Sequence, residues 1–368
     1  MIRISLCMIV KNEEGILQKC LSSVTNLVDE IIIMDTGSTD KTKEVAAAFT
    51  DKIYDFTWSH DFSAARNAAF DKATMDYILW LDADDVLPPE EAEKFAELKK
   101  TLPPDVDAVY MGYNAAFDDA GRPTFSYARE RLVKRSCGFR WREPVHEYLA
   151  IGGKILQSDV CINHVKEKWE ANDRNLRIYE RRLSKGEPLT PRGTYYYARE
   201  LRDNGRFEEA AAVFRRFLDD GQGWVEDNIT ACEDLAGCLA ATGKPKEALT
   251  ALLESFRYDT PRAELCCRIG YHHKERSDYR QARFWFELAL NLKKPEPVRG
   301  FYQADCWGYI PSLECAVCCD KLGDFENAVR YNELAATFKP GSQAVAYNRR
   351  YFASRKESEN NAKRGSPM

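Results

Sequence analysis

The first 110 residues alternate apolar runs with amphipathic segments, and this alternation limits the fold more than any other feature of the sequence. RISLCMIV, EIIIM, KIYDFTW and YILWL are typical of strands. GILQKCLSSVTNL, KTKEVAAAF and SAARNAAFDKA have helical spacing between them. Strands without a polar face, separated by helices, predict a mostly parallel, Rossmann-like sheet that is covered on both sides. Such open sheets bind their ligands beyond the carboxyl ends of the strands.

A second pattern begins near residue 191, where strand signals cease. The similar segments GRFEEA, GKPKEA, SDYRQA and GDFENA start at 205, 243, 277 and 323, with spacings of 38, 34 and 46 residues. The middle spacing is the tetratricopeptide period, and the longest fits that period with an insertion around KKPEPVRGFYQA. Each repeat should therefore be a helix pair that buries its apolar face against its neighbours.

These two sequence patterns predict two domains in the 368 residues. We expect an α/β domain over 1–165, a linker helix over 166–190, an all-α domain of helical repeats over 191–352, and a disordered tail over 353–368. Within the first domain, residues 110–165 are aromatic and mixed in character, and we expect short antiparallel strands and loops that close over the site.

Composition excludes several classes of protein. A net charge of −5 argues against a nucleic-acid binder that relies on bulk charge. No apolar run is long enough for a transmembrane segment, and MIRISLCMIV runs into KNEE without a cleavage site, so we interpret it as a strand. The 12 cysteines include one CxxC pair but no second pair at zinc-finger spacing, which favours small buried residues of a reduced, cytoplasmic protein.

Aspartates follow two of the predicted strands. EIIIM ends on Asp35, and YILWL is followed by Asp82, Asp84 and Asp85. If this stretch is extended, Asp82 and Asp84 point the same way and can hold Mg²⁺ or Mn²⁺, whereas Asp85 faces away and anchors the turn. The alternative is a solvated turn, because aspartate is a good turn former.

Asp35 and two further polar residues fall at the same predicted edge or near it. Asp35 can accept from the imide N–H of uracil, or from backbone amides of the TGST turn. Glu13, after the first strand, can accept from a ribose hydroxyl. Arg66 in SAARN suits a nucleotide or phosphate, and its alternative is an ordinary surface arginine.

Taken together, CMIVKNEE, EIIIMDTGSTDKT, WSHDFSAARNAAF and YILWLDADD resemble family 2 glycosyltransferases of the GT-A fold, over about the first 165 residues. The resemblance implies that Asp35 reads the base of a nucleotide-sugar, most simply a UDP-sugar. It implies that Asp82 and Asp84 bind Mn²⁺ or Mg²⁺ on the diphosphate, with Asp84 preferred as the direct ligand. Such enzymes invert the anomeric centre in one displacement.

The general base is harder to identify. Many relatives use an aspartate in an ED-like motif, which this sequence lacks at the usual place. Its WREPVHEYL resembles the subgroup that is fused to helical repeats, and we expect Glu147 to be the base, with His146 as the second candidate. A structural hydrogen-bonded pair is the alternative. His164 in CINHV could complete the metal shell, as a late histidine does in several GT-A enzymes, or could be purely structural.

The domain order also resembles peptide S- or O-glycosyltransferases that modify bacteriocins, so the acceptor could be a peptide, a protein or a glycan. Helical arrays bind polypeptides and also form homodimers. The competing hypothesis is a scaffold that binds a sugar nucleotide without turnover while its array binds a partner. A nucleotidyltransferase is disfavoured because VKNEEG offers no basic phosphate loop.

Overall fold

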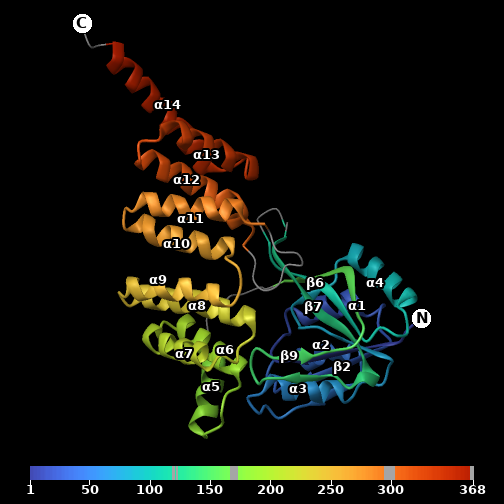
Figure 1. Cartoon of the computed structure of the whole chain (residues 1–368). Helices are drawn as coiled ribbons and strands as arrows, with labels where there is room; N and C mark the ends of the chain where they lie inside the picture. Colours follow the sequence, from blue (N-terminus) through green and yellow to red (C-terminus); the bar gives the residue numbers. More distant parts are fainter. Residues whose placement is uncertain (118–120, 122, 166–172, 294–302, 365–368) are drawn as a thin grey trace. The chain divides into compact units, whose positions relative to one another are not determined.

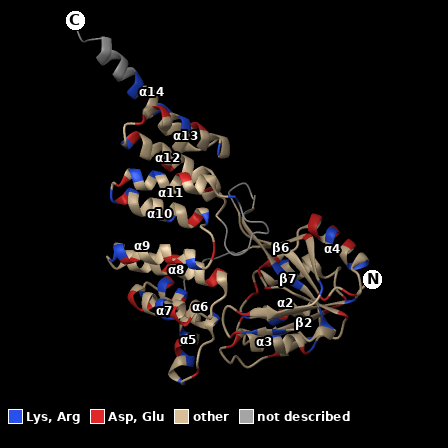
Figure 2. Ribbon diagram, in the orientation of Figure 1, with Lys and Arg blue, Asp and Glu red and all other residues tan. Residues whose placement is uncertain are grey.

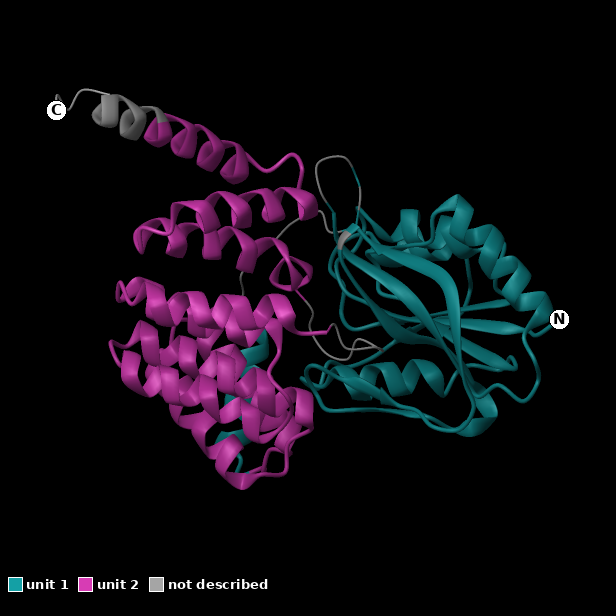
Figure 3. Ribbon diagram, turned by 45° about the horizontal axis from the view of Figure 1, so that its top comes forward, with its two compact units in different colours: residues 1–186 teal, residues 187–368 magenta. Residues whose placement is uncertain are grey.

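The computed structural model describes residues 1–117, 121, 123–165, 173–293 and 303–364, and its chain divides into two compact units, Met1–Gly186 and Glu187–Met368 (Figure 3). The first unit therefore continues beyond the predicted end at 165. Part of the expected linker, 166–172, lies outside the described residues. The remainder carries helix α5 (Arg174–Ser184), which belongs to the first unit.

The first unit is a single large sheet with helices, and one short separate hairpin (Figure 1). Its strands are β1 (Ile4–Val10), β2 (Glu30–Asp35), β3 (Ile53–Asp55), β4 (Tyr77–Trp80), β5 (Asp85–Val86), β6 (Ala108–Phe117), β7 (Pro123–Lys134), β8 (Arg140–Arg142), β9 (Tyr148–Ala150) and β10 (Ile155–His164). Its other helices are α1 (Leu17–Val24), α2 (Thr42–Ala47), α3 (Phe62–Phe70) and α4 (Pro89–Thr101), with a 3₁₀ turn at Arg135–Cys137.

The sheet has eight strands in the order β3-β2-β1-β4-β7-β6-β10-β5. Six strands run in one direction, and β7 and β5 run against them, as the pairing of neighbours shows. The predicted mostly parallel, Rossmann-like sheet is confirmed. Ile4, Leu6 and Met8 of β1 are buried, because β1 lies inside the sheet between β2 and β4.

Residues 110–165 depart from the prediction. We expected short strands and covering loops, but β6, β7 and β10 each span ten residues or more and widen the main sheet. The alternation of buried and exposed positions along β10 explains this, because it is the pattern of a strand with one covered face. Only β8 and β9 form a short separate hairpin in the described part of this region.

The second unit is an array of helix pairs, as the repeats predict (Figure 1). Its helices are α6 (Pro191–Asp203), α7 (Phe207–Asp220), α8 (Val225–Ala241), α9 (Pro245–Glu254), α10 (Ala263–Glu275), α11 (Tyr279–Asn291), α12 (Tyr309–Lys321), α13 (Phe325–Phe338) and α14 (Gln343–Arg364), with 3₁₀ turns at Ser255–Arg257 and Ala304–Trp307. Along these helices Lys and Arg are interspersed with Asp and Glu (Figure 2).

The repeat segments mark the turn inside each helix pair. Gly205, Gly243, Ser277 and Gly323 all have positive φ, between 61° and 79°. Each precedes the second helix of its pair by two residues. A left-handed residue at this position ends one helix and redirects the chain, which explains why glycine recurs there.

The expected insertion and the expected disordered tail both fall in the second unit. Most of the expected insertion, 294–302, lies outside the described residues. The tail that we expected to be disordered from 353 is instead helical as far as Arg364, because α14 continues through it. This segment is rich in Ala, Arg, Lys and Glu, which favour helix once a preceding turn has formed.

The cysteines of the second unit are buried and unpaired, and Cys315 and Cys318 of the CxxC pair lie in its apolar core with Cys266 and Cys267. They serve as small core residues, as the sequence indicates. None of the described helices combines the length and apolar character that a membrane crossing requires.

Candidate functional site

Three strand ends bring carboxylates to one edge of the sheet. Val10 at the end of β1 pairs with Asp35 at the end of β2, and β4, the other neighbour of β1, leads directly into Asp82. Glu13 follows β1. The parallel register therefore places these residues where open α/β sheets bind their ligands.

Asp35 is buried and only half satisfied. Its Oδ2 accepts from the backbone amides of Gly37 and Ser38, at 3.1 and 3.0 Å, which is the turn contact that we considered as the alternative. Its Oδ1 is buried and has no hydrogen-bond partner among the described residues. A buried carboxylate oxygen without a donor is costly, so Asp35 retains an acceptor for a ligand N–H.

Glu13 belongs to a loop that is fastened to the loop after β2. The amide of Glu13 donates to Thr42 Oγ1 at 2.7 Å, and Asn12 Oδ1 accepts from the amide of Thr39 at 2.8 Å. Burial raises the pKa of Glu13 to about 7, with further contributions from Asp84, Asp40 and Asp82. The side chain of Glu13 therefore lies among the acidic residues of this edge.

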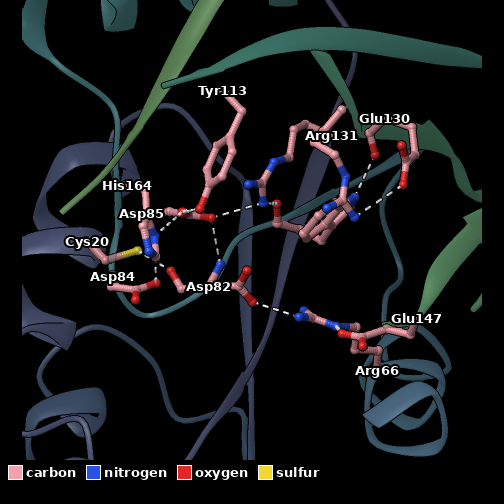
Figure 4. Close-up of polar contacts among 12 residues, drawn as sticks. Cys20, Arg66, Asp82, Asp84, Asp85, Tyr113, Glu130, Arg131, Glu147 and His164 are labelled. Atoms are coloured by element: carbon pink, nitrogen blue, oxygen red, sulfur yellow. Dashed lines mark hydrogen bonds and ion pairs between the residues drawn. The ribbon is translucent and has the colours of Figure 1, made fainter. Parts of the chain in front are cut away.

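The stretch after β4 is a turn and not an extended segment. The amide of Asp85 donates to the carbonyl of Asp82 at 3.1 Å, so the chain reverses within the DADD motif. Asp82 consequently points to Arg66, whereas Asp84 points to His164 (Figure 4). Our premise that Asp82 and Asp84 share one direction was wrong, because side-chain alternation requires an extended backbone.

Asp85 is the anchor of that turn, as expected, and its partners come from distant strands. Its Oδ1 accepts from the hydroxyl of Tyr113 at 2.9 Å, and its Oδ2 pairs with Arg131 at 2.9 Å and accepts from the amide of Asp82 at 2.9 Å. Burial and Asp85 raise the pKa of Tyr113, so the phenol remains a donor. Sequence reasoning missed Tyr113 and Arg131, because neither stands in one of the motifs that the sequence analysis considered.

Asp84 and His164 form the part of the site that fits a divalent metal ion. Within the described residues, Asp84, Asp85 and His164 are the one group whose ligand atoms gather closely, all within 4.8 Å. His164 Nδ1 lies 3.4 Å from Asp84 Oδ1, and the pKa of His164 is raised to about 9 by Asp84 and then Asp85. Because both Asp85 oxygens are already engaged, Asp84 and His164 are the better ligands.

Arg66 occupies a different place from the one expected. It is buried, and it joins two carboxylates: its Nη2 lies 2.7 Å from Asp82 Oδ1 and its Nε lies 2.8 Å from Glu147 Oε1 (Figure 4). Burial opposes ionisation of Asp82, but Arg66 and Arg131 outweigh it and lower the pKa of Asp82 to about 2. Because it pairs with Asp82 and Glu147 inside the protein, Arg66 braces the site, which revises the surface and phosphate interpretations.

The loop that carries Glu147 is tied to the start of α3. The amide of Phe62 donates to the carbonyl of Pro144 at 2.8 Å, and Asn67 exchanges two hydrogen bonds with the backbone of Trp141. His146 has a φ of 52°, a strained conformation for a non-glycine residue. The structure thus places Glu147 next to Arg66, which also pairs with Asp82, and His146 precedes Glu147 on the same well-fastened loop.

Residues 5–153 match the family model Glycosyl transferase family 2. A TPR repeat-containing protein of Synechococcus elongatus is 28% identical over 312 residues, covering 83% of this chain and 70% of the relative. The SPbeta prophage-derived glycosyltransferase SunS of Bacillus subtilis is 28% identical over 228 residues, covering 58% of this chain and 52% of SunS, so the match spans about half of that relative. Glucosyl-3-phosphoglycerate synthase of Mycobacterium tuberculosis, solved with Mn²⁺ and UDP-glucose, aligns with a TM-score of 0.35 at 15% identity, over 52% of this chain and 81% of the synthase.

Proposed function

We propose that this chain, which belongs through its N-terminal unit to glycosyltransferase family 2, transfers a sugar from a nucleotide-sugar to an acceptor with inversion of the anomeric centre. The observation that carries the proposal is the convergence of Asp35, Asp82 and Asp84 on one sheet edge, next to Glu147. A nucleotide-sugar needs a base contact, charge compensation for its diphosphate and a nearby base for the acceptor, and this edge offers candidates for each.

The donor would bind with its base at Asp35. The unpartnered Oδ1 suits the imide N–H of uracil, which supports a UDP-sugar. Glu13 lies at the same edge and would accept from a ribose hydroxyl.

Mn²⁺ or Mg²⁺ would be held by Asp84 and His164, with Asp82 beside them. When bound, such an ion supplies a Lewis acid for the diphosphate. Asp85 contributes indirectly: its three contacts hold the turn that presents Asp84.

In the transfer step the acceptor atom attacks the anomeric carbon, and the bond from that carbon to the phosphate oxygen breaks. Glu147 takes the proton of the acceptor, and His146 is the second candidate. The ion pair with Arg66 fixes Glu147 Oε1. A glutamine at this position can still accept from Arg66 through its amide oxygen, so Glu147→Gln separates proton transfer from bracing.

The acceptor is proposed to be a peptide, protein or glycan, because helix-pair arrays offer extended surfaces for polypeptides. The same array could support a homodimer. We place the activity in the cytoplasm, where nucleotide-sugars would be available to an enzyme with reduced cysteines.

The first experiment is donor binding and slow hydrolysis across UDP-, GDP- and dTDP-sugars, with Mn²⁺, Mg²⁺ or EDTA. We expect metal-dependent binding of one donor, abolished turnover in Asp84→Ala, and retained donor binding with lost transfer in Glu147→Gln. Normal turnover by Asp84→Ala would refute the metal assignment, and full transfer by Glu147→Gln would remove Glu147 as base. If the folded, unaltered chain neither binds nor hydrolyses any of these donors, the scaffold hypothesis would be favoured.

A further inference from the structure

Three arginine side chains lie against the indole ring of Trp80 at the donor edge. Their guanidinium carbons are 3.9 Å (Arg131), 5.0 Å (Arg129) and 5.3 Å (Arg66) from the ring centroid. Cations at these distances are attracted by the face of the ring. Three positive charges therefore lie around Trp80, whereas the sequence motifs indicate only that of Arg66.

Two of these arginines are committed inside the protein. Arg66 pairs with Asp82 and Glu147. Arg131 pairs with Asp85 at 2.9 Å and donates to the carbonyl of Trp80 at 3.3 Å. Their side chains are only 10% and 1% exposed, so neither is well placed to reach a ligand.

Arg129 differs from both. Its charged contact among the described residues is the adjacent Glu130, with 3.6 Å between Nη2 and Oε1, which is too long for a hydrogen bond. Its side chain is 28% exposed. The guanidinium therefore rests on Trp80 while its forked donors remain able to bind an anion.

The strand register places Arg129 at the donor edge. β7 runs antiparallel to β4, with Leu132 opposite Leu79. Arg129 lies three residues before Leu132 on β7, and its charge, after those of Arg66 and Arg131, lowers the pKa of Asp82, which follows β4. Because β7 is antiparallel, its earlier residues approach the edge where the parallel strands end.

We propose that Arg129 binds the diphosphate of the nucleotide-sugar and stabilises the departing nucleoside diphosphate; this inference rests on the proposed function. As the bond between anomeric carbon and phosphate oxygen breaks, its electron pair stays on that oxygen. Arg129 meets this charge with hydrogen bonds and keeps its own proton. Trp80 holds the guanidinium in place, so little ordering remains to be done during the reaction.

The test compares the unaltered chain with Arg129→Ala, Arg129→Lys and the matched control Arg3→Ala, whose exposed arginine pairs with Asp76 at the start of β1. Calorimetric titration in Mn²⁺ measures affinity for UDP, UMP and uridine, and thermal unfolding verifies that each variant is folded. We expect Arg129→Ala to weaken UDP binding by about 10- to 100-fold and to leave uridine binding unchanged, because only the diphosphate contact is lost. The UDP affinity of Arg129→Lys should lie between those of the unaltered chain and Arg129→Ala. The kcat of each variant should decrease together with its UDP affinity.

Three results would contradict the proposal, each in a different way. UDP affinity and kcat within twofold of normal in folded Arg129→Ala would overturn this assignment alone. Failure of the unaltered chain to bind any of UDP, GDP or dTDP would overturn the proposed function, and the assignment with it. Equal losses for uridine and UDP would show a general disturbance of the site and would also refute a diphosphate role.

Discussion

Substitution of Asp85 by asparagine tests whether a buried ion pair holds the DADD turn. Asp85 accepts from Tyr113 and from the amide of Asp82, and it is the counter-ion of Arg131, all at 2.9 Å. Both charged side chains are almost fully buried. Asparagine preserves the shape and one acceptor, but it leaves the buried charge of Arg131 without its counter-ion. Breaking such a pair from one side costs about 3 to 5 kcal/mol, and the retained acceptor favours the lower end.

For a unit of this size, about 3 kcal/mol corresponds to a decrease of roughly 6 to 12 °C in the Tm of the first unit. Scanning calorimetry on the full chain measures this, and a variant of the second unit identifies which transition belongs to which unit. A decrease below about 2 °C would refute the reasoning, because it would mean that Arg131 finds solvent or another partner at little cost.

The double variant Asp85→Leu with Arg131→Met separates stability from function. Removing both charges should recover at least half of the lost stability, since well-packed apolar residues often replace a buried pair without penalty. Donor turnover should be lost in the double variant, because the amide of Asp82 has no acceptor and the turn that presents Asp84 is no longer fixed. Restored turnover would show that the turn forms without its anchor.

Three further predictions address other parts of the chain. Burial would raise the pKa of Glu30, but hydrogen bonds from Lys52, Ser5 and Thr74 lower it to about 2. The carboxylate therefore stabilises the folded state fully above its unfolded pKa, and this stabilisation is lost as the pH falls toward 2. In Glu30→Gln the free energy of unfolding should depend less on pH within that window. Gly223→Ala should destabilise the second unit by about 1 to 3 kcal/mol in denaturant unfolding, because its Cβ would overlap Asn228 and buried Phe217. Gly237→Ala in α8, where nothing lies within 4 Å of the added Cβ, should stabilise the second unit by about 0.5 to 1 kcal/mol. Asp35→Asn should reduce UDP affinity more than CDP affinity in titration calorimetry, because an amide N–H at the unpartnered position suits cytosine N3 and opposes the uracil imide.

The sheet and the repeats were predictable because their signals are local. Apolar runs, helical spacing and strand–helix alternation lie within a few residues of one another, and the repeat starts are visible as GRFEEA and its counterparts. The widening of the sheet by β6, β7 and β10 was not predictable, because nothing in a single strand names its neighbour. The helical tail was missed since polar composition alone does not distinguish a disordered segment from an exposed helix.

At the site, motifs located the edge but not the directions of the side chains. Asp82 and Asp84 diverge because Asp85 draws the chain into a turn, and it can do so only with Tyr113 and Arg131 as partners. Those partners come from β6 and β7, far along the chain, and spacing within DADD carries no information about them.

Contacts between distant strands also explain why Arg66 and Arg129 exchange their expected roles. Arg66 stands in a motif and is the natural candidate for the phosphates, yet folding buries it between Asp82 and Glu147. Arg129 stands in a strand that carries no motif, yet antiparallel pairing brings it to the donor edge with its donors uncommitted beyond Glu130 among the described residues. A cation binds a substrate only if the protein has not already neutralised it, and that balance depends on contacts between distant strands. The assignment of Arg129 therefore follows from the folded arrangement of charge, and its substitution should impair diphosphate binding more than any change to the exposed arginines.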